Sequence, residues 1–232
     1  MSDNNPHTAA PLRLPLKFMH RPAQAGVKEP WLLLLMHGVG SHEEDLFGLA
    51  PYVPANFHVI SLRAPNVMHA DAYAWFNFAV HANGERSIDE EQERESRFLV
   101  GEILQSACQQ LGVPAERTVA GGFSQGGIMS LSVLLTRPQL MRAAMVCHRR
   151  LLPQVLSHVA PREAFEGKSL WVSHGLNDNV IPIGAAVATR EFVRQFPLRL
   201  AGADFPGAHE IRPAELQQTM AWLQELSGTA PV

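Results

Sequence analysis

Short apolar runs recur along the chain and alternate with segments whose apolar residues repeat at helical spacing. Compact apolar runs bounded by glycine, proline or polar residues are typical of buried strands. The runs predict strands at residues 31–36, 57–62, 117–121, 143–147, 169–173 and 198–201. Residues 12–19 alternate only partly, and we expect them to form an edge strand that pairs antiparallel with its neighbour.

Helical spacing fills the gaps between these runs. It predicts a long helix that begins at Ser87 and further helices at 126–136, 183–196 and 213–226. The apolar face of the longest helix comprises Phe98, Leu99, Ile103, Ala107 and Leu111. Its acidic first turns suit the helix dipole, so we interpret that charge run as a solvated face. Strands that alternate with helices imply an α/β fold, with a mostly parallel central sheet and helices on both faces.

Length and charge limit the classes of function. The chain has 232 residues, of which 46% are hydrophobic, so we expect a loose N-terminal leader at 1–11 and a single domain at 12–232. The formal charge of −3 and the lack of a basic cluster argue against a nucleic-acid partner. No apolar run is long enough to cross a bilayer and no signal pattern opens the chain. We therefore expect no integral membrane association and a cytoplasmic location.

Cysteine and histidine spacing indicates neither a metal nor a cofactor. Cys108 falls in a predicted helix and Cys147 in a predicted strand, without the spacing of a zinc or redox motif, so both are expected to be buried thiols in a reducing compartment. The eleven histidines also lack zinc-site spacing. His37 and His174 each precede a glycine at a strand end, where a role in ordering the loop accounts for them.

The most informative motif is Gly122-Phe123-Ser124-Gln125-Gly126. It lies between a predicted strand and a predicted helix, the context of the nucleophile elbow of α/β-hydrolases. This turn strains the serine backbone, and the residues two before and two after it must be small so that strand and helix can approach each other. Gly122 and Gly126 satisfy that requirement. Because a serine hydroxyl is a weak nucleophile at neutral pH, Ser124 requires an adjacent base.

Candidate partners follow in the chain order that this fold uses. Asp178 comes just after the strand at 169–173, and His209 follows the last predicted strand. His209 would accept the serine proton, and Asp178 would orient the imidazole. Two alternatives stay open, because Asn-Asp-Asn is also good turn chemistry and Asp204 is a second acid near His209. We predict Ser124, Asp178 and His209 as a catalytic triad.

The loop after the strand at 31–36 supplies a candidate oxyanion hole. It reads His37-Gly38-Val39-Gly40, whose glycines allow a backbone N–H to point at a reacting carbonyl. In this fold the second donor is the residue after the nucleophile. We assign the two donors to the backbone N–H groups of Val39 and Gln125, with Gly40 as the alternative for the first.

These motifs together resemble the phospholipase/carboxylesterase family of small α/β-hydrolases, relatives of acyl-protein thioesterases. The resemblance extends from about residue 30 to about residue 212. It rests on His37-Gly38-Val39-Gly40, Glu44-Asp45-Leu46, Arg63-Ala64-Pro65, Ala74-Trp75-Phe76, Gly122-Phe123-Ser124-Gln125-Gly126, Arg137-Pro138, Leu151-Leu152-Pro153, His174-Gly175 with Asp178, and His209-Glu210. The resemblance implies a serine esterase without a cofactor that acts on carboxylic esters or thioesters.

The substrate-binding residues are less well marked. Trp75 and Phe76 form an aromatic pair that is either core or, as the resemblance suggests, a wall of the acyl or alcohol pocket. His148-Arg149-Arg150 departs from the family, which usually has a small residue at this strand end. We expect His148 to contact substrate. The two arginines either form a cationic rim that favours anionic substrates or are ordinary solvated surface.

The sequence therefore predicts a cytoplasmic serine carboxylesterase that hydrolyses small-molecule or lipid-like esters through an acyl-enzyme. A thioesterase or lysophospholipase that takes long acyl chains is the alternative within enzymes. A non-catalytic ligand-binding homologue is the alternative from another class, although such proteins usually have a broken triad. A homodimer is suggested by family analogy alone.

Overall fold

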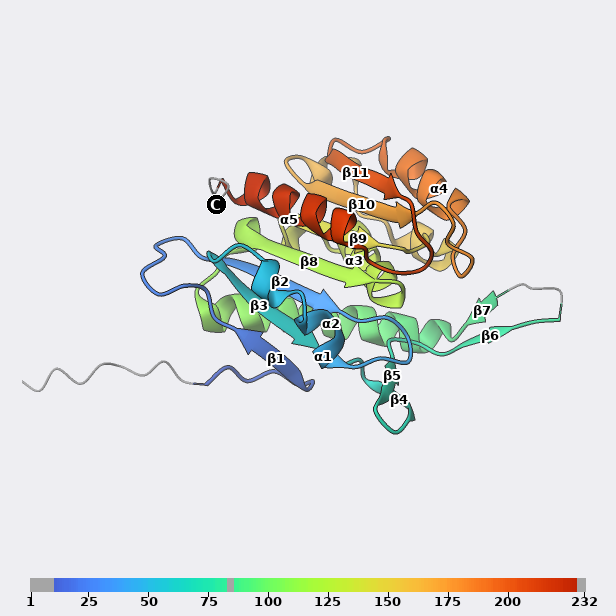
Figure 1. The fold of residues 1–232 in the computed structure, drawn as a ribbon, viewed down its shortest axis with the longest axis horizontal. Coiled ribbons are helices and arrows are strands. Elements are labelled where there is room, and N and C mark those ends of the chain that lie inside the picture. The colour runs from blue at the N-terminus through green and yellow to red at the C-terminus, as the bar shows by residue number, and fades with distance from the viewer. Residues whose placement is uncertain (1–10, 83–85, 229–232) are drawn as a thin grey trace, which may run out of the picture.

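A seven-stranded sheet forms the centre of the computed structural model, which describes residues 11–82 and 86–228 (Figure 1). The strand order is β1-β3-β2-β8-β9-β10-β11. The strands are β1 (Phe18–Arg21), β2 (Trp31–Met36), β3 (Phe57–Leu62), β8 (Thr118–Phe123), β9 (Ala143–Cys147), β10 (Ser169–Gly175) and β11 (Arg199–Phe205). Only β1 runs antiparallel to its neighbour, β3, and the other pairs are parallel. The predicted α/β-hydrolase fold is confirmed.

The strand bounds follow the prediction closely except at the N-terminus. β2, β3 and β9 have the predicted bounds, whereas β8, β10 and β11 run further at their carboxyl ends. The edge strand expected at 12–19 is wrong in its position, because β1 starts at Phe18. Residues before it lie along a helix instead, and the backbone N–H and C=O of Arg13 hydrogen-bond to the Gln110 side chain. The leader expected at 1–11 falls almost wholly outside the described residues.

Five helices cover the two faces of the sheet within the described ranges. They are α1 (Glu43–Phe47), α2 (Glu90–Leu111), α3 (Gln125–Thr136), α4 (Gly184–Val193) and α5 (Pro213–Ser227). Residues of α2, α3 and α4 pack in one apolar cluster, and residues of α1 and α5 pack in a second. Helices therefore lie on both faces of the sheet, as the sequence predicts.

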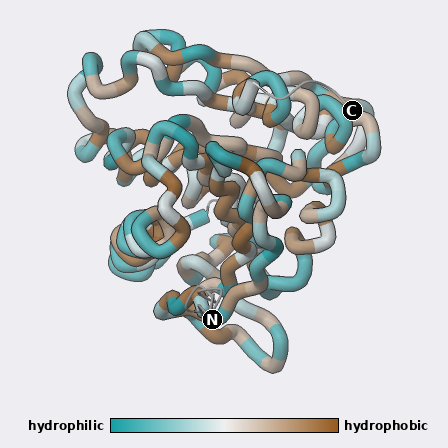
Figure 2. Tube along the Cα trace, turned by 90° about the vertical axis from the view of Figure 1, so that its left-hand side faces the viewer, coloured by the Kyte–Doolittle hydropathy of each residue, from teal (hydrophilic) through white to brown (hydrophobic). Residues whose placement is uncertain are grey.

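The fully buried strand β2 shows how the sequence builds both clusters. Its even-numbered residues, Leu32, Leu34 and Met36, belong to the first cluster, and its odd-numbered residues belong to the second. Successive side chains of a strand point to opposite faces, so a continuous apolar run fits a strand that is covered on both sides. Figure 2 shows the hydrophobic stretches gathered in the interior of the molecule, with hydrophilic segments along its outer loops.

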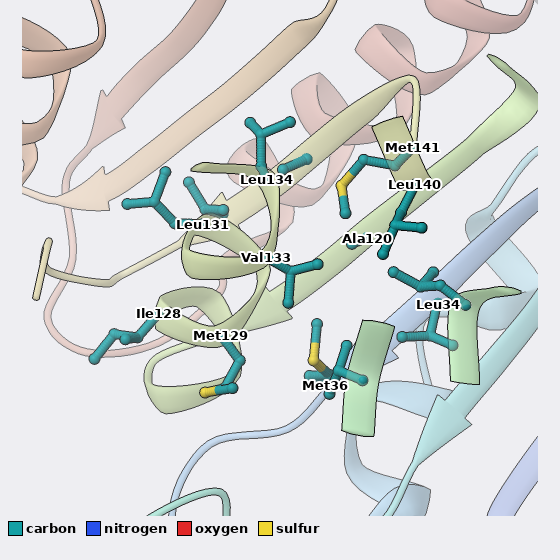
Figure 3. Close-up of a cluster of buried hydrophobic side chains, with 14 of the residues drawn as sticks. Leu34, Met36, Ala120, Ile128, Met129, Leu131, Val133, Leu134, Leu140 and Met141 are labelled. Atoms are coloured by element: carbon teal, nitrogen blue, oxygen red, sulfur yellow. The ribbon is translucent and has the colours of Figure 1, made fainter. Parts of the chain in front are cut away.

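The first cluster centres on α3, the helix that follows Ser124. Eleven of its twelve residues are buried. Figure 3 shows α3 side chains such as Met129 and Val133 lying near Met36 and Leu34 of β2 and Ala120 of β8. A helix that is apolar all round belongs in a core. The helix that begins directly after the candidate nucleophile is thus packed tightly into the core.

The longest helix starts later than predicted. Asp89 caps α2 by accepting a hydrogen bond from the Gln92 N–H at 3.0 Å, while Ser87 lies in a short strand. Phe98, assigned to the apolar face, is 61% exposed, and the Arg137 guanidinium lies 5.4 Å from its ring. Ile103 and Ala107 are buried as predicted, together with Val100 and Leu104, and Leu99 and Leu111 are partly buried against the same cluster.

Two hairpins between β3 and α2 were not predicted. They pair β4 (Asn66–His69) with β5 (Ala72–Ala74) and β6 (Phe78–Val80) with β7 (Arg86–Ile88). Figure 1 shows the second hairpin extending away from the body of the molecule, beyond the carboxyl ends of the parallel strands.

In the described part of the chain, none of the helices combines the length and the apolar character needed to cross a membrane.

Candidate active site

Ser124 lies at the point where the order of the sheet reverses. The chain passes from β2 outward to β3 and then returns to the other side of β2 to form β8. In open α/β sheets, ligands bind in the crevice beyond the carboxyl ends of the strands at this switch point. Both the loop after β2 and the turn after β8 open into it. The topology therefore brings Val39 and Ser124 to the same edge.

The turn at Ser124 has the strained geometry of a nucleophile elbow. Its φ is 54° and its ψ is −118°, in the region that side chains rarely adopt. A Cβ on Gly122 would lie 2.3 Å from the Gly126 carbonyl carbon, and one on Gly126 would lie 1.8 Å from the Met36 oxygen. Both glycines are therefore required by backbone contact, for the reason that the sequence suggested.

The structure brings Ser124, His209 and Asp178 into one hydrogen-bonded chain. The His209 Nε2 lies 2.9 Å from the Ser124 Oγ, and its Nδ1 lies 2.7 Å from the Asp178 Oδ2. Since an ionised carboxylate can only accept, the Nδ1–H donates and Nε2 is left to accept the serine proton. The competing acid, Asp204, is engaged elsewhere, because Arg190 donates two hydrogen bonds to it.

Asp178 accepts four hydrogen bonds, one for each of its lone-pair sites. Oδ1 accepts from the backbone N–H groups of Val180 and Ile181 at 2.9 and 2.8 Å. Oδ2 accepts from His209 and, at 3.0 Å, from the Nδ1 of His148. Burial alone would raise the pKa of Asp178, but these donors hold it at about 2. The carboxylate is therefore ionised and fixed in orientation.

His148 is the residue whose position sequence reasoning misjudged. Its side chain is fully buried, and its Nε2 lies 3.1 Å from the Oε2 of Glu215, at the start of α5. Both ring nitrogens are thus occupied by carboxylates, which leaves no atom for a polar contact with substrate. Burial lowers the pKa of His148, but the hydrogen bonds to Glu215 and Asp178 outweigh it and raise the pKa overall. Glu215 was missed because it lies in an ordinary acidic helix start.

The loop after β2 presents the candidate oxyanion donors. A Cβ on Gly38 would lie 3.3 Å from the Ser124 Cβ, so the loop passes directly beside the nucleophile. The Gly40 N–H donates to the Tyr73 carbonyl at 2.9 Å, which removes it as the alternative donor. Gln125 is the first residue of α3, where backbone N–H groups have no partner within the helix. Val39 and Gln125 both line the pocket at Ser124.

Trp75 and Phe76 are placed differently from each other. The Trp75 side chain is fully buried, and its indole N–H donates to the His37 carbonyl at 3.0 Å. The Gln125 side chain bonds to the backbone of both residues, accepting from the Trp75 N–H at 2.7 Å and donating to the Phe76 carbonyl at 2.6 Å. Trp75 thus supports the loop that carries His37, whereas Phe76, also almost fully buried, is one of the residues that line the pocket.

A small pocket of about 90 Å³ lies beside Ser124. It is lined by Val39, Phe76, Phe78, Arg86, Ser124, Gln125, Ile128, Arg150, Val180 and Ile181. Phe78 and Arg86 come from the β6–β7 hairpin, whose paired strands were not predicted. Arg150, left open by the sequence, lies in the pocket wall. Arg149 points elsewhere: it is fully buried, and burial lowers its pKa to about 9.

A second hollow, of about 300 Å³, meets the candidate triad at His209. Its walls include Phe123, His209, Leu49 and Ile211. The last two residues also line an open groove of about 610 Å³ along α5, which continues over apolar side chains such as Met220. One hollow therefore adjoins Ser124 and another adjoins His209.

The buried histidines offer the one cluster of possible metal ligands found among the described residues. Ligand atoms of His148, His174 and Asp178 lie within 4.8 Å of one another. The Asp178 oxygens and both His148 nitrogens already take part in the hydrogen bonds described above, and the His174 Nε2 lies 2.7 Å from the Ile181 carbonyl. The cluster is thus accounted for as a hydrogen-bond network around the candidate triad.

Comparison with known proteins connects this geometry to a family. The family profile described as Phospholipase/Carboxylesterase matches residues 23–227. Acyl-protein thioesterase 1 of Kluyveromyces lactis is 27% identical over 211 residues, which cover 84% of this chain and 91% of that protein. Acyl-protein thioesterase 1 of Eremothecium gossypii is 31% identical over 159 residues, 67% of this chain and 66% of that protein.

The fold agrees with solved structures of esterases. The crystal structure of the Bacillus cereus carboxylesterase has a TM-score of 0.77 to this chain at 21% identity, and the match covers 91% of this chain and 94% of that one. At this identity the likeness shows the fold alone.

Proposed function

The chain belongs to the phospholipase/carboxylesterase family, and from that premise we propose that it is a serine carboxylesterase. The observation that carries the proposal is the chain of hydrogen bonds from Ser124 through His209 to Asp178. It contains a nucleophile, a base and a group that orients the base, in the geometry that acyl transfer needs.

The reaction proceeds through an acyl-enzyme. The Ser124 Oγ attacks the ester carbonyl as His209 takes its proton, and the backbone N–H groups of Val39 and Gln125 stabilise the tetrahedral oxyanion. Each such donor typically contributes about 3–4 kcal/mol to the transition state. His209 then protonates the leaving alkoxide, and water repeats the sequence to release the acid.

The two hollows would hold different parts of the substrate. The leaving alkoxide must receive its proton from the His209 Nε2, and His209 lines the larger hollow but not the pocket of about 90 Å³. The acyl group therefore occupies the small pocket. A volume equal to about three water molecules, at ~30 Å³ each, favours a short acyl chain.

A second candidate is a thioesterase or lysophospholipase that accepts a long acyl chain. The groove along α5 favours it, because its apolar wall joins the hollow at His209 through Leu49 and Ile211. The relatives named acyl-protein thioesterase 1 are consistent with this alternative. In that case the acyl chain would lie along α5 and the alcohol or thiol would lie elsewhere.

Labelling with a fluorophosphonate probe tests the chemistry. We expect the wild-type protein to react and Ser124→Ala to lose both labelling and several orders of magnitude of activity while circular dichroism stays unchanged. Surface Ser157→Ala, in a 3₁₀ helix away from the pocket, is the matched control. Equal labelling of Ser124→Ala, or no labelling of folded wild type, would contradict the proposal.

A series of p-nitrophenyl esters from acetyl to palmitoyl separates the two candidates. Best turnover on short acyl chains supports the carboxylesterase, and a long-chain optimum supports the second candidate. Met220→Trp narrows the groove along α5. If it selectively slows the long-chain esters, the acyl chain lies in that groove.

A further inference from the structure

Two arginines face the pocket beside the candidate nucleophile. Arg150 follows β9 and is half-buried, and Arg86 begins β7 on the hairpin. Both line the same pocket, and burial together with the charge of Arg86 lowers the pKa of Arg150. The rest of the pocket wall is mainly apolar, from Phe76, Ile128 and Ile181. Two positively charged residues therefore line a mainly apolar cavity.

Neither guanidinium is paired with a carboxylate of the residues that the structure describes. Over residues 11–82 and 86–228, no hydrogen bond or ion pair joins Arg86 or Arg150 to a carboxylate, and the contact recorded for Arg86 is with the Phe78 ring at 5.7 Å. Some arginines of the chain do have acidic partners, such as Arg63 with Glu43, Arg97 with Glu93 and Arg190 with Asp204. Like charges disfavour one another in a partly desolvated site, and a bound anion relieves that repulsion.

We propose that the small pocket selects an acyl chain that ends in a carboxylate, so that the preferred substrates are monoesters of short dicarboxylic acids. The proposal rests on the proposed function, which places the acyl group in this pocket. Hydrolysis breaks the bond between the acyl carbon and the alcohol oxygen, consumes one water and releases the alcohol and the dicarboxylate. Arg86 and Arg150 bind the distal carboxylate and take no part in the bond changes.

The test compares two ethyl esters with acyl chains of five carbons. Monoethyl glutarate carries the distal carboxylate, and ethyl pentanoate has a methyl group there. Release of ethanol gives kcat/KM for each, and the quantity measured is the ratio of the two constants in the wild type, Arg150→Gln and Arg86→Gln. Arg199→Gln removes the same charge at the far end of β11, where the side chain is exposed and pairs with Glu225, and it serves as the control.

We expect the wild type to prefer monoethyl glutarate and each pocket variant to lower the ratio by roughly 10- to 100-fold, the range of a charge-assisted hydrogen bond. The control should keep the wild-type ratio. Equal ratios in the wild type and both variants would overturn this proposal while ethyl pentanoate turnover and fluorophosphonate labelling still support the esterase. Loss of labelling and of both activities would instead indicate failure of the proposed function.

An independent inference comes from the buried side of the triad. His148 has a φ of 50°, a left-handed conformation that few residues adopt, and this backbone directs its ring between Asp178 and Glu215. When both carboxylates are ionised, both ring nitrogens donate, which is the imidazolium form. The titratable groups that surround the ring are Asp178 and Glu215 in hydrogen-bond contact, His174 and His209 in ring contact, and Glu210 at longer range.

We infer that Glu215 and His148 form a positioning pair that holds the Asp178 carboxylate and offsets part of its charge. Without the pair, one lone-pair site of Asp178 loses its donor and His209 faces the full negative charge. Less of the enzyme would then be in the active form at low pH. The pair thus sets both the orientation of Asp178 and the acid limit of activity.

Two substitutions at His148 separate these effects. His148→Asn suits the left-handed backbone and retains a neutral N–H donor near the position of Nδ1, whereas His148→Gly suits the backbone and removes the donor. We expect His148→Gly to lower kcat at least tenfold with little change in KM, and His148→Asn to recover most of the loss at alkaline pH. In His148→Asn the midpoint of the acid limb of kcat/KM should rise by about one pH unit, because a positive charge near His209 is gone.

Thermal unfolding of both variants checks that they fold. A His148→Gly protein with wild-type kcat would overturn the positioning role, and an unshifted acid limb in His148→Asn would overturn the role of the charge. If His148→Gly does not fold, the pH profile of His148→Asn still tests the role of the charge.

Discussion

The two sides of Ser124 and His209 satisfy their polar groups in opposite ways. On the inner side, formed by Asp178, His148 and Glu215, each oxygen of Asp178 and each ring nitrogen of His148 has a partner, and the side chains are buried. Of the Glu215 oxygens, only Oε2 has a hydrogen-bond partner within the described residues. On the outer side, formed by Arg86, Arg150 and Phe78, two positive charges lack acidic partners over the described ranges and Phe78 is 40% exposed.

This difference indicates which part of the site belongs to the reaction and which belongs to the substrate. A group that must keep one orientation through every turnover benefits from complete internal pairing, because no solvent reorganisation is then needed. A group that recognises a ligand must be free of internal partners until the ligand arrives. The inner side therefore fits catalytic support, and the outer side fits selection among esters.

The strongest test of the inner side is Asp178→Asn. An amide has one acceptor oxygen and a donor NH₂ group, so it cannot accept from the two backbone N–H groups and from both histidines. We expect kcat to fall roughly 10⁴-fold through the wrong tautomer of His209, as in other enzymes with this arrangement. Steady-state kinetics measures the loss.

Asp204→Asn provides the matched control for this substitution. Asp204 pairs with Arg190 and lies away from the candidate triad in the hydrogen-bond network. If Asp204→Asn lost as much kcat as Asp178→Asn, the assignment of the acid would be wrong.

The sequence predicted the framework of the site because its signals are local. Gly122 and Gly126 mark a turn that only glycine fits, and the order of Ser124, Asp178 and His209 follows from strand ends that meet at one edge of a parallel sheet. Those three side chains do come together, and their roles remain part of the proposal. The single domain, the cytoplasmic location and the homodimer also stay predictions.

The rest depended on contacts between distant segments. Glu215 and His148 are in contact although 67 positions of sequence separate them. Glu215 lies in the first turn of α5 (Pro213–Ser227), where an acidic residue is expected because it interacts favourably with the helix dipole. Arg86 reaches the pocket through a hairpin whose strands are short and exposed, so its pattern was taken for loop and helix start. Such pairings need the tertiary structure.

Unfolding free energies provide the next test of the comparison. Glu215→Ala leaves the buried His148 without one of its two carboxylates, and breaking a buried charged pair typically costs about 3–5 kcal/mol. Arg86→Ala removes an exposed side chain and should change stability by no more than about 0.5 kcal/mol. Urea denaturation measures both values. Similar losses in the two variants would remove the distinction between the inner and outer sides.

The smallest expected effect is the change with pH in the stability that the inner side contributes. The hydrogen bonds to Glu215 and Asp178 raise the pKa of His148 against the opposing effect of burial, so its protonated form is stabilised by folding. A raised pKa in the folded state contributes stability that is complete below the unfolded value of about 6.5 and is lost as the pH rises through the folded value. Asp178 works the other way: its pKa of about 2 contributes stability above about pH 4 that is lost only in stronger acid.

Between pH 6 and 9 the protonation of His148 therefore changes stability more than the protonation of Asp178 does. Glu215→Gln isolates the His148 effect, because the amide keeps a hydrogen-bonding group but removes the charge. We expect the difference in unfolding free energy between wild type and Glu215→Gln to be largest at pH 6 and to shrink by about 1.4 kcal/mol for each unit by which Glu215 raises the His148 pKa. The difference between wild type and Arg150→Gln should not vary with pH in this range, because that guanidinium stays protonated. A Glu215→Gln difference that is constant from pH 6 to 9 would mean that no proton is held on the inner side, and the contrast between the two sides would then be one of burial alone.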